Sequence, residues 1–306
     1  MKQQLSIQLM GTTIDVIVMA DNPENYLKLA QRRLFEYNQL FSANQANSDL
    51  MTINQCAGLK AVTVKPELLQ LIQLGKLHSM APDSFLNIAL GPLIQTWRIG
   101  FTDAKQPSQS EIAQKLRQCD PEKIIINETQ RSIFLTEAGM KLDLGALAKG
   151  YIADLLASEL ELSGATAGLI NMGGTVRTFG PSQRLDHKWY ITIKNPHDQQ
   201  NPLPQVLKIG AESVVTSGIY ERTLCVKGKT FHHIFNPKTG YPIVSDVESL
   251  TIVSPDSVAG EIWTTRLFGL DAQAIIIALE SEIGVEGLVL TKDNQVLATT
   301  GIQKYL

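Results

Sequence analysis

The sequence predicts an α+β protein in which one large domain, residues 1–306, combines mixed sheets with packed helices. Stretches with strand-like alternation and stretches with helical spacing of apolar residues both occur along the whole chain. They do not follow the regular strand–helix–strand order that a parallel, doubly wound sheet requires. No internal repeat, low-complexity tract or linker divides the chain, so a single domain is expected.

The composition is that of a globular protein and excludes several functional classes. Hydrophobic residues make up 44% and charged residues 19%, and the net charge is −3. Without a basic excess, we expect no nucleic-acid partner. No run of 18 apolar residues occurs, so no transmembrane segment is expected. Cys56, Cys119 and Cys225 are odd in number and far apart, which predicts three reduced thiols rather than disulfides.

The N-terminus begins with a strand-like pattern rather than with a targeting signal. Residues 6–9 alternate between polar and apolar, and no apolar segment follows a basic start. No small-residue cleavage site is present either. We therefore expect a cytoplasmic location, and removal of a leader from an exported protein stays open as the alternative.

The elements of the first half are predicted from periodicity and boundary residues. Two strands flank residues 11–13, and a helix opens at Pro23 and continues to about Gln39. The polar stretch 41–54 predicts a loop, and the apolar segment 84–101, interrupted by Gly-Pro, predicts a buried turn region. The remaining expected elements are helices at 66–80 and 110–118, a hairpin of 123–127 and 132–136, and a helix at 146–162.

The second half mixes strands and helices in the same way. Residues 168–176 predict a strand broken at Gly173-Gly174, where paired glycines indicate a bulge or a ligand close to the backbone. A tight turn explains these glycines equally well. Residues 195–204, polar with two prolines, predict a surface loop. The other expected elements are strands at 189–194, 206–209, 214–216, 222–226 and 250–254, helices at 257–270 and 272–280, and a hairpin at 287–300.

Residues 141–154 form the first segment with chemical potential. Asp143 ends an extended stretch that passes through Gly145 into a helix N-terminus, whose free N–H groups suit a phosphate. Lys149, one turn into the helix, could reach the same anion. The glycine spacing is not that of a Walker motif. A surface lysine on an amphipathic helix is the alternative, which this segment alone slightly favours.

Two further segments offer hydroxyl, imidazole and carboxylate groups. Thr216-Ser217-Gly218 ends a strand, and His233, before an Asn-Pro-Lys-Thr-Gly turn, is a candidate general base. A lone histidine is more often structural, and no zinc-ligand spacing is present. Glu261 and Thr265 stand at i and i+4, so their oxygens share a helix face that suits Mg²⁺. An ordinary side-chain hydrogen bond is the alternative there.

Taken together and in order, these segments resemble the ApbE family, the FAD:protein FMN transferases, also described as thiamine-biosynthesis lipoproteins. The resemblance spans about residues 8–270, and its most specific parts are LGALAKG and the H-I-x-N-P-x-T-G-Y-P pattern from His233 onward. The matching segments are Met10-Gly-Thr, the loop from Ser42 to Asn54, Gly91-Pro-Leu followed by Trp97, LDLGALAKGYIAD, NMGG, TSG-Y-ER, HHIFNPKTGYP and the helix from Ser257 to Leu270.

The resemblance implies an enzyme that binds FAD as substrate, with Mg²⁺ at the pyrophosphate. It would transfer the FMN half of FAD to a Thr or Ser hydroxyl of an acceptor protein and release AMP. Two alternatives use the same site. One is an FAD pyrophosphatase that yields FMN and AMP, and the other is an FAD-binding protein without turnover.

The resemblance also assigns residues to this chemistry. It implies that Asp143 and Lys149 contact FAD, that the Ala146 carbonyl binds Mg²⁺, and that Glu261 and Thr265, with Thr264 adjacent, are side-chain ligands. His233 is the predicted base that activates the acceptor hydroxyl or orients the reacting groups. The other residues predicted at the FAD site are Met10, Ser42, Asn47, Ser48, Leu86, Asn87, Ile88, Thr216, Ser217 and Ile234.

Three positions depart from the family pattern. Gly260-Glu261 replaces the usual Ala-Asp, which predicts either a helix set slightly further back or weaker metal binding, because Mg²⁺ demands tight geometry. Leu86-Asn87 replaces Phe-Asp and removes a negative charge. Arg266 stands where a small residue is usual, and it either reaches a phosphate or only covers the helix face.

Overall fold

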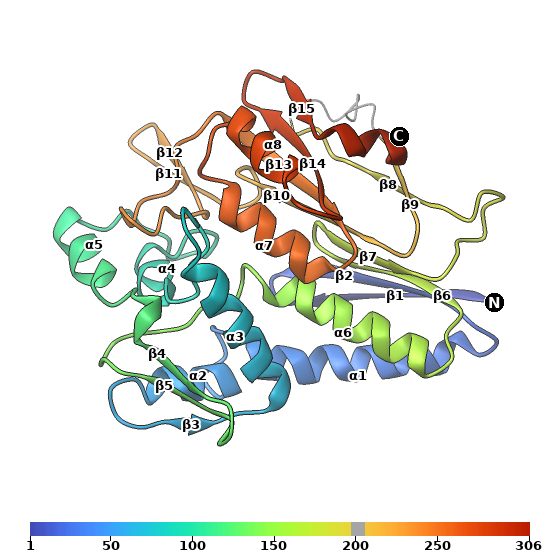
Figure 1. Ribbon diagram of the computed structural model, residues 1–306. Coiled ribbons are helices and arrows are strands. Elements are labelled where there is room, and N and C mark those ends of the chain that lie inside the picture. Colours follow the sequence, from blue (N-terminus) through green and yellow to red (C-terminus); the bar gives the residue numbers. More distant parts are fainter. Residues whose placement is uncertain (197–205) are drawn as a thin grey trace.

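An antiparallel sheet forms the centre of the computed structural model, which describes residues 1–196 and 206–306 (Figure 1). Within these residues the sheet has eight strands in the order β1-β2-β6-β7-β10-β13-β14-β15, and every neighbouring pair is antiparallel. The strands are β1 (Lys2–Leu9), β2 (Thr12–Met19), β6 (Ala167–Met172), β7 (Thr175–Phe179), β10 (Ser213–Gly218), β13 (Val247–Ser254), β14 (Glu286–Thr291) and β15 (Val296–Ala298). The mixture of this sheet with helices confirms the α+β class.

Three helices lie along one face of the sheet: α1 (Pro23–Phe41), α6 (Ala148–Leu162) and α7 (Ser257–Leu267) (Figure 1). α6 contacts β6 and β7 as well as both other helices, and α7 contacts β10 and β13. Apolar residues at helical spacing, such as Ala30, Leu34 and Leu156, are fully buried in the core between helices and sheet. The two helices that carry the Lys149 and Glu261 motifs are therefore neighbours on one surface.

The opposite face of the sheet is covered by the two-stranded pair β8 (Trp189–Thr192) and β9 (Val206–Ile209) and by the C-terminal η2 (Thr300–Tyr305). Ile302 and Tyr305 of η2 pack with Leu207 and Ile209 in a second apolar cluster. Helix α8 (Ala272–Glu280) packs on β14 and β15. The C-terminal segment thus completes the core rather than hanging free.

Smaller elements are arranged around one end of the helical layer (Figure 1). They include a three-stranded sheet in the order β3-β5-β4 and the hairpin of β11 and β12, whose Leu224 and Phe231 pack against the cluster containing Trp97. Their bounds are α2 (Asp49–Gln55), β3 (Val62–Thr63), α3 (Pro66–Ser79), α4 (Gly91–Trp97), α5 (Gln109–Leu116), η1 (Pro121–Lys123), β4 (Ile124–Asn127), β5 (Ser132–Leu135), β11 (Thr223–Val226) and β12 (Lys229–His232).

Most predicted elements are confirmed, but some segments differ. The expected loop 41–54 contains the start of α2, because the buried Ser48 hydroxyl accepts a hydrogen bond from Met51 N and caps that helix. The expected turn region 84–101 contains α4, which begins at Gly91-Pro92, where proline suits the first helical turn. β3 and β12 were not predicted. The surface loop predicted at 195–204 lies almost wholly outside the described residues.

Gly173-Gly174 marks a tight turn rather than a broken strand. The two glycines have φ values of +70° and +97°, a region open to glycine at little cost, and they join β6 to β7. The Cβ that another residue would carry at position 173 would overlap Thr12. Of the two interpretations left open by the sequence, the turn is confirmed.

No helix in the described part of the chain is long and apolar enough to cross a membrane. The longest helix, α1, has 19 residues but carries charged side chains along its exposed side.

Candidate functional site

α6 and α7 pack tightly against each other at Gly150. A Cβ at this position would lie 2.6 Å from the Ser257 carbonyl oxygen and 2.7 Å from Glu261 Cγ, so only glycine allows the crossing. The adjacent Lys149 places its Nζ 3.3 Å from Glu261 Oε1. Two residues that lie 112 positions apart in sequence therefore form a partly buried ion pair at the crossing.

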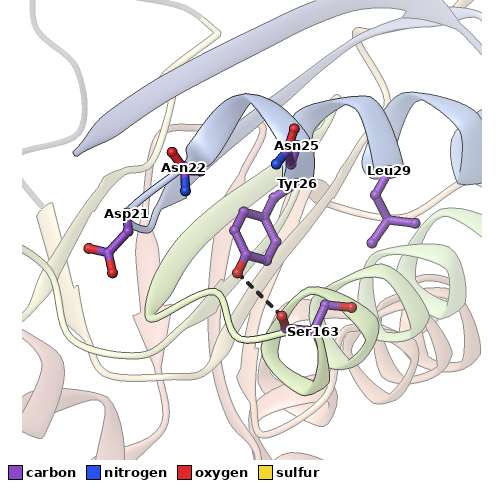
Figure 2. Close-up of a pocket in the computed structure, with 6 residues that line it drawn as sticks. All are labelled: Asp21, Asn22, Asn25, Tyr26, Leu29 and Ser163. Carbon is purple, nitrogen blue, oxygen red and sulfur yellow. Dashed lines mark hydrogen bonds between the residues drawn. The ribbon is translucent and has the colours of Figure 1, made fainter.

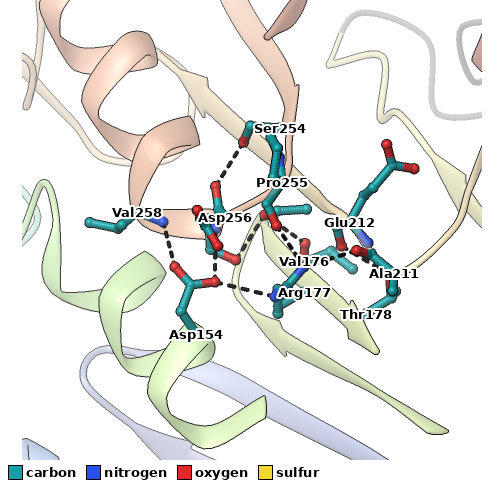
Figure 3. A network of polar contacts seen from close by, with 12 residues as sticks. Asp154, Val176, Arg177, Thr178, Ala211, Glu212, Ser254, Pro255, Asp256 and Val258 are labelled. Carbon is teal, nitrogen blue, oxygen red and sulfur yellow. Dashed lines mark hydrogen bonds and ion pairs between the residues drawn. The ribbon is translucent and has the colours of Figure 1, made fainter. Parts of the chain in front are cut away.

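A second contact holds the start of α7 against α6. Both oxygens of Asp154 accept hydrogen bonds from the first N–H groups of α7, those of Ser257 and Val258, at 2.8 Å each (Figure 3). Arg177 of β7 places Nε 3.3 Å from Asp154 Oδ1 and donates from Nη1 to the Pro255 carbonyl. Burial raises the pKa of Asp154 to about 6, against the effect of the two N–H groups and of Arg177.

Glu261 is nearly enclosed, with 3% of its surface exposed. Its Oε1 accepts a hydrogen bond from the Thr175 hydroxyl at 2.7 Å. The preceding Gly260 lies directly on β10, since a Cβ there would be 2.6 Å from Val215 Cγ2. α7 therefore lies close to the sheet at Gly260. The Glu261 side chain, one methylene longer than that of aspartate, extends from this closely packed part of the helix.

Asp143 occupies the turn before α6. Its Oδ1 accepts a hydrogen bond from Gly145 N at 2.8 Å, and its own N–H donates to the Ile88 carbonyl at 2.9 Å. Burial raises the pKa of the Asp143 carboxyl, while the Gly145 N–H and the charge of Arg222 oppose this shift. Gly145 and Ala146 are exposed in this turn, which directly precedes α6.

Arg222 directly precedes β11 and His233 directly follows β12, so both lie at the open end of this hairpin. His233 Nδ1 is 3.4 Å from the Arg222 carbonyl oxygen. Burial and then the Arg222 charge lower the pKa of His233 to about 4, and the Lys149 charge acts in the same direction to a smaller extent. The imidazole is therefore neutral near pH 7, where it can accept a proton but is a weak base.

Arg222 is the central residue that the sequence interpretation did not assign to the site. Its side chain runs across Gly100, whose Cβ position lies 2.9 Å from Arg222 Cδ, and its Nη2 is 3.3 Å from the Cβ position of Gly11. Arg222 is exposed, and its guanidinium forms no ion pair within residues 1–196 and 206–306. Its charge nevertheless lowers the pKa of both Asp143 and His233. Its presence in the TSG-Y-ER match was the available signal.

The glycine turn and the Thr-Ser-Gly segment are also brought together. The N–H of Thr216 donates to the Gly174 carbonyl at 2.9 Å, and the Thr216 hydroxyl lies 2.9 Å from that of Thr251 on β13. Thr216 and Ser217 are half-buried at this end of β10. Met10, with a φ of +54°, begins the β1–β2 turn next to the Arg222 side chain.

Several other predicted FAD-site residues use their side chains inside the fold. Ser48 is fully buried and donates to the Ser42 carbonyl, while Ser42 Oγ accepts from the N–H groups of residues 44 and 45. Leu86 and Ile88 are core residues. Asn87 donates to the Cys119 carbonyl and accepts from Ala89 N. Asn47 is exposed, and Ile234 is half-buried beside the α7–α8 cluster. For the buried members, only backbone atoms remain for a ligand.

The oxygen donors around α7 fit Mg²⁺ better than zinc. Glu261 and Thr265 share a face of α7, and the exposed turn with Ala146 lies one helical turn before Gly150, which touches Glu261. Carboxylate, hydroxyl and carbonyl oxygens are ligands that Mg²⁺ prefers. Residues 1–196 and 206–306 contain no group of three or more His, Cys, Asp or Glu placed to hold a metal. Thr264 is fully buried and its hydroxyl donates to the Glu261 carbonyl, so Thr265 is the better-placed threonine.

Arg266 covers the helix face. Its guanidinium carbon lies 4.6 Å from the centre of the Trp263 ring, and Nη1 is 3.4 Å from His78 Nδ1. Its Nε is buried without a hydrogen bond. Of the two roles left open by the sequence, the structure favours packing.

A cavity of about 450 Å³ lies away from these residues, between the start of α1 and the end of α6 (Figure 2). It is lined by Asp21, Asn22, Asn25, Tyr26, Leu29 and Ser163. Along α6, Lys149 and Ser163 are separated by about 20 Å at 1.5 Å per residue. The cavity therefore takes no part in the Lys149–Glu261 site.

The antiparallel sheet and its three covering helices recur in solved structures of two ApbE proteins. The ApbE protein from Thermotoga maritima matches with a TM-score of 0.90 and 25% identity, over 100% of this chain and 99% of that chain. Flavin transferase ApbE from Vibrio cholerae matches with a TM-score of 0.85 and 24% identity, over 100% and 99% of the two chains, which shows the shared fold.

The chain belongs to the ApbE family, whose family model matches residues 10–289. An FAD:protein FMN transferase from Klebsiella pneumoniae is 39% identical over 295 residues, covering 96% of this chain and 91% of that protein. One from Treponema pallidum is 30% identical over 312 residues, covering 96% and 86%. The resemblance found in the sequence motifs is thereby confirmed.

Proposed function

We propose that this protein transfers the FMN moiety of FAD to a Thr or Ser hydroxyl of an acceptor protein, with release of AMP and in dependence on Mg²⁺. The observation that carries the proposal is the Lys149–Glu261 pair at the α6–α7 crossing, with Thr265 on the same helix face. It occurs in a chain that is 39% identical to an FAD:protein FMN transferase.

Positively charged side chains and backbone N–H groups around the N-terminus of α6 would bind the FAD pyrophosphate. Lys149 supplies a charge there, the exposed turn at 145–146 supplies backbone groups, and Arg222 approaches from the hairpin. Glu261, Thr265 and the Ala146 carbonyl would hold Mg²⁺. When bound, the metal would neutralise pyrophosphate charge and stabilise the leaving phosphate.

The transfer forms a bond between the acceptor oxygen and the FMN phosphorus and breaks the phosphorus–oxygen bond to AMP. The acceptor hydroxyl loses its proton in this step. His233, neutral near pH 7 because its pKa is lowered to about 4, can accept the proton or orient the hydroxyl. A base this weak helps most once the oxygen–phosphorus bond is forming, since the hydroxyl then becomes more acidic.

The test mixes purified protein, FAD, Mg²⁺ and an acceptor domain that a known FAD:protein FMN transferase modifies. Mass spectrometry should show acceptor that carries FMN, and chromatography should show AMP. An acceptor with its modified Thr replaced by Val is the matched control and should stay unmodified. Release of FMN and AMP without acceptor labelling would indicate a pyrophosphatase, and FAD that stays intact throughout would indicate binding without turnover; either result contradicts the proposal.

A further inference from the structure

The Thr175 hydroxyl contacts Glu261 in the interior of the protein. Thr175 is 1% exposed and Glu261 3% exposed, and Thr175 Oγ1 donates to Glu261 Oε1 at 2.7 Å. A hydrogen bond to a charged acceptor in a poorly solvated place is stronger than one at the surface. This contact therefore restricts where the carboxylate can point.

The two partners of the Glu261 side chain engage the same oxygen. Thr175 and Lys149 both approach Oε1, at 2.7 Å and 3.3 Å. In the described part of the chain, no hydrogen bond from another side chain falls on Oε2. One carboxylate oxygen is thus held by the fold, and the other is left for a ligand.

The position of Thr175 follows from the Gly173-Gly174 turn. This turn starts β7, and its Gly174 carbonyl accepts from Thr216 N on β10, so the first residue of β7 is fixed at the sheet surface beneath α7. Gly150 limits the carboxylate from the other side, since its Cβ position lies 2.7 Å from Glu261 Cγ. The glycine turn of the NMGG motif therefore places the Thr175 hydroxyl next to Glu261.

We infer that Thr175 is a positioning residue for the metal site: it holds Oε1 of Glu261 so that Oε2 is presented to Mg²⁺. The inference rests on the proposed function, because it takes Glu261 as the metal ligand. In this role Thr175 itself touches neither the metal nor FAD. Supporting groups of this kind orient metal ligands, and their loss typically weakens metal binding by about 10-fold to 100-fold.

β7 offers a matched control for the loss of a buried hydroxyl. Thr178 is fully buried on the same strand. Its Oγ1 donates to the Gly210 carbonyl at 2.6 Å, lies 2.9 Å from the Glu212 carbonyl and accepts from Glu212 N at 3.2 Å. Because Thr178 is three residues from Thr175 along the strand, its side chain points to the opposite face of the sheet. Thr178→Val therefore removes at least as many buried hydrogen bonds as Thr175→Val, but only Thr175 contacts Glu261.

The test measures Mg²⁺ affinity by isothermal titration calorimetry, with Mg²⁺ alone and with FAD present but no acceptor, and the melting temperature of each variant. Thr175→Val should weaken Mg²⁺ binding about 10-fold or more. Thr175→Ser, which keeps the hydroxyl, should bind within about 3-fold of the unmodified protein. Thr178→Val should lower the melting temperature at least as much as Thr175→Val and leave Mg²⁺ affinity unchanged.

The variant Glu261→Gln distinguishes failure of the positioning role of Thr175 from failure of the proposed metal site. If Glu261→Gln loses Mg²⁺ affinity while Thr175→Val keeps it, or if Thr178→Val weakens binding as much as Thr175→Val, the positioning role is wrong and the metal site stands. If Glu261→Gln binds Mg²⁺ as well as the unmodified protein, Glu261 is not a ligand, and the proposed metal site fails together with the role of Thr175.

Discussion

At the scale of single residues, the site depends on charges whose protonation is set by their neighbours. Arg222 lies beside Asp143 and His233 and favours the anionic form of the first and the neutral form of the second. A positive charge near a histidine lowers its pKa because it disfavours the imidazolium ion. Arg222 therefore keeps His233 ready to accept a proton, in addition to any contact with phosphate.

Replacing Arg222 with Ala should raise the pKa of His233 above its value of about 4. The same change should raise the pKa of Asp143 further, because an opposing positive charge is lost. An NMR pH titration of the His233 ring protons measures the first shift. Lys229→Ala, exposed on the same hairpin, is the control and should leave the titration unchanged; an unaltered His233 pKa in Arg222→Ala would contradict this electrostatic role.

At the scale of elements, the α6–α7 crossing decides whether Lys149 and Glu261 meet. Gly150 sets the separation of the helix axes, and Asp154 fixes the first turn of α7 against α6. Both residues lie in the segment that the sequence singled out for its lysine. Their structural role was not predicted, because α7 is more than 90 residues further along the chain.

Gly150→Ala should destabilise the protein by about 1–3 kcal/mol, since a methyl group would overlap the Ser257 carbonyl and Glu261. The higher helix propensity of Ala, worth about 1 kcal/mol, opposes this effect but is smaller. Urea unfolding measures the change. Ser158→Ala, at an exposed position of α6, should stay within about 0.5 kcal/mol. A stabilised Gly150→Ala protein would show that the helices can separate at little cost.

Asp154 should make stability fall as the pH rises. Its pKa is about 6 in the folded protein, against an ordinary aspartate value of 3.8 for the unfolded chain, so the folded state binds more protons between these values. Stability from this group is therefore fully present below pH 4 and lost as the pH rises through 6, by at most about 3 kcal/mol. The free energy of unfolding is measured with urea for the unmodified protein and for Asp154→Asn. The value for the unmodified protein minus that for the variant should fall as the pH rises over this range. A pH-independent difference would mean that Asp154 does not titrate there.

At the scale of the whole molecule, the three cysteines report on its packing. All are free thiols, as predicted, with Cys225 exposed, Cys56 half-buried and Cys119 buried in the cluster with Trp97. Burial raises the pKa of Cys119 to about 12, so its reactive thiolate is scarce. The order of exposure therefore predicts an order of reactivity.

Thiol labelling at pH 8 should modify Cys225 first and Cys119 only when the cluster opens. Cys225→Ser should abolish the fast phase and leave the slow one, as followed by mass spectrometry of peptides. Rapid labelling of Cys119 in the folded protein would contradict the packing of α4, α5 and the β11–β12 hairpin around it.

The α+β class, most helices and strands, and the family could be predicted from the sequence, because they depend on local periodicity, capping and short motifs. α2 and α4 were missed because short helices in polar or glycine-containing segments carry weak periodic signals. Thr175, Arg177 and Arg222 were missed for another reason. Each acts through a partner on a different element, and sequence spacing does not encode such contacts.

Local sequence established which chemical groups are present: a lysine at a helix N-terminus, a carboxylate and hydroxyl on one helix face, and a histidine before a rigid turn. Which atoms meet depended on the packing of distant segments. The glycine at position 150 lets two helices touch, the glycine turn places Thr175 beneath Glu261, and Arg222 crosses to Asp143 and His233. Local pattern selects residue types, whereas steric fit between distant segments fixes distances and protonation.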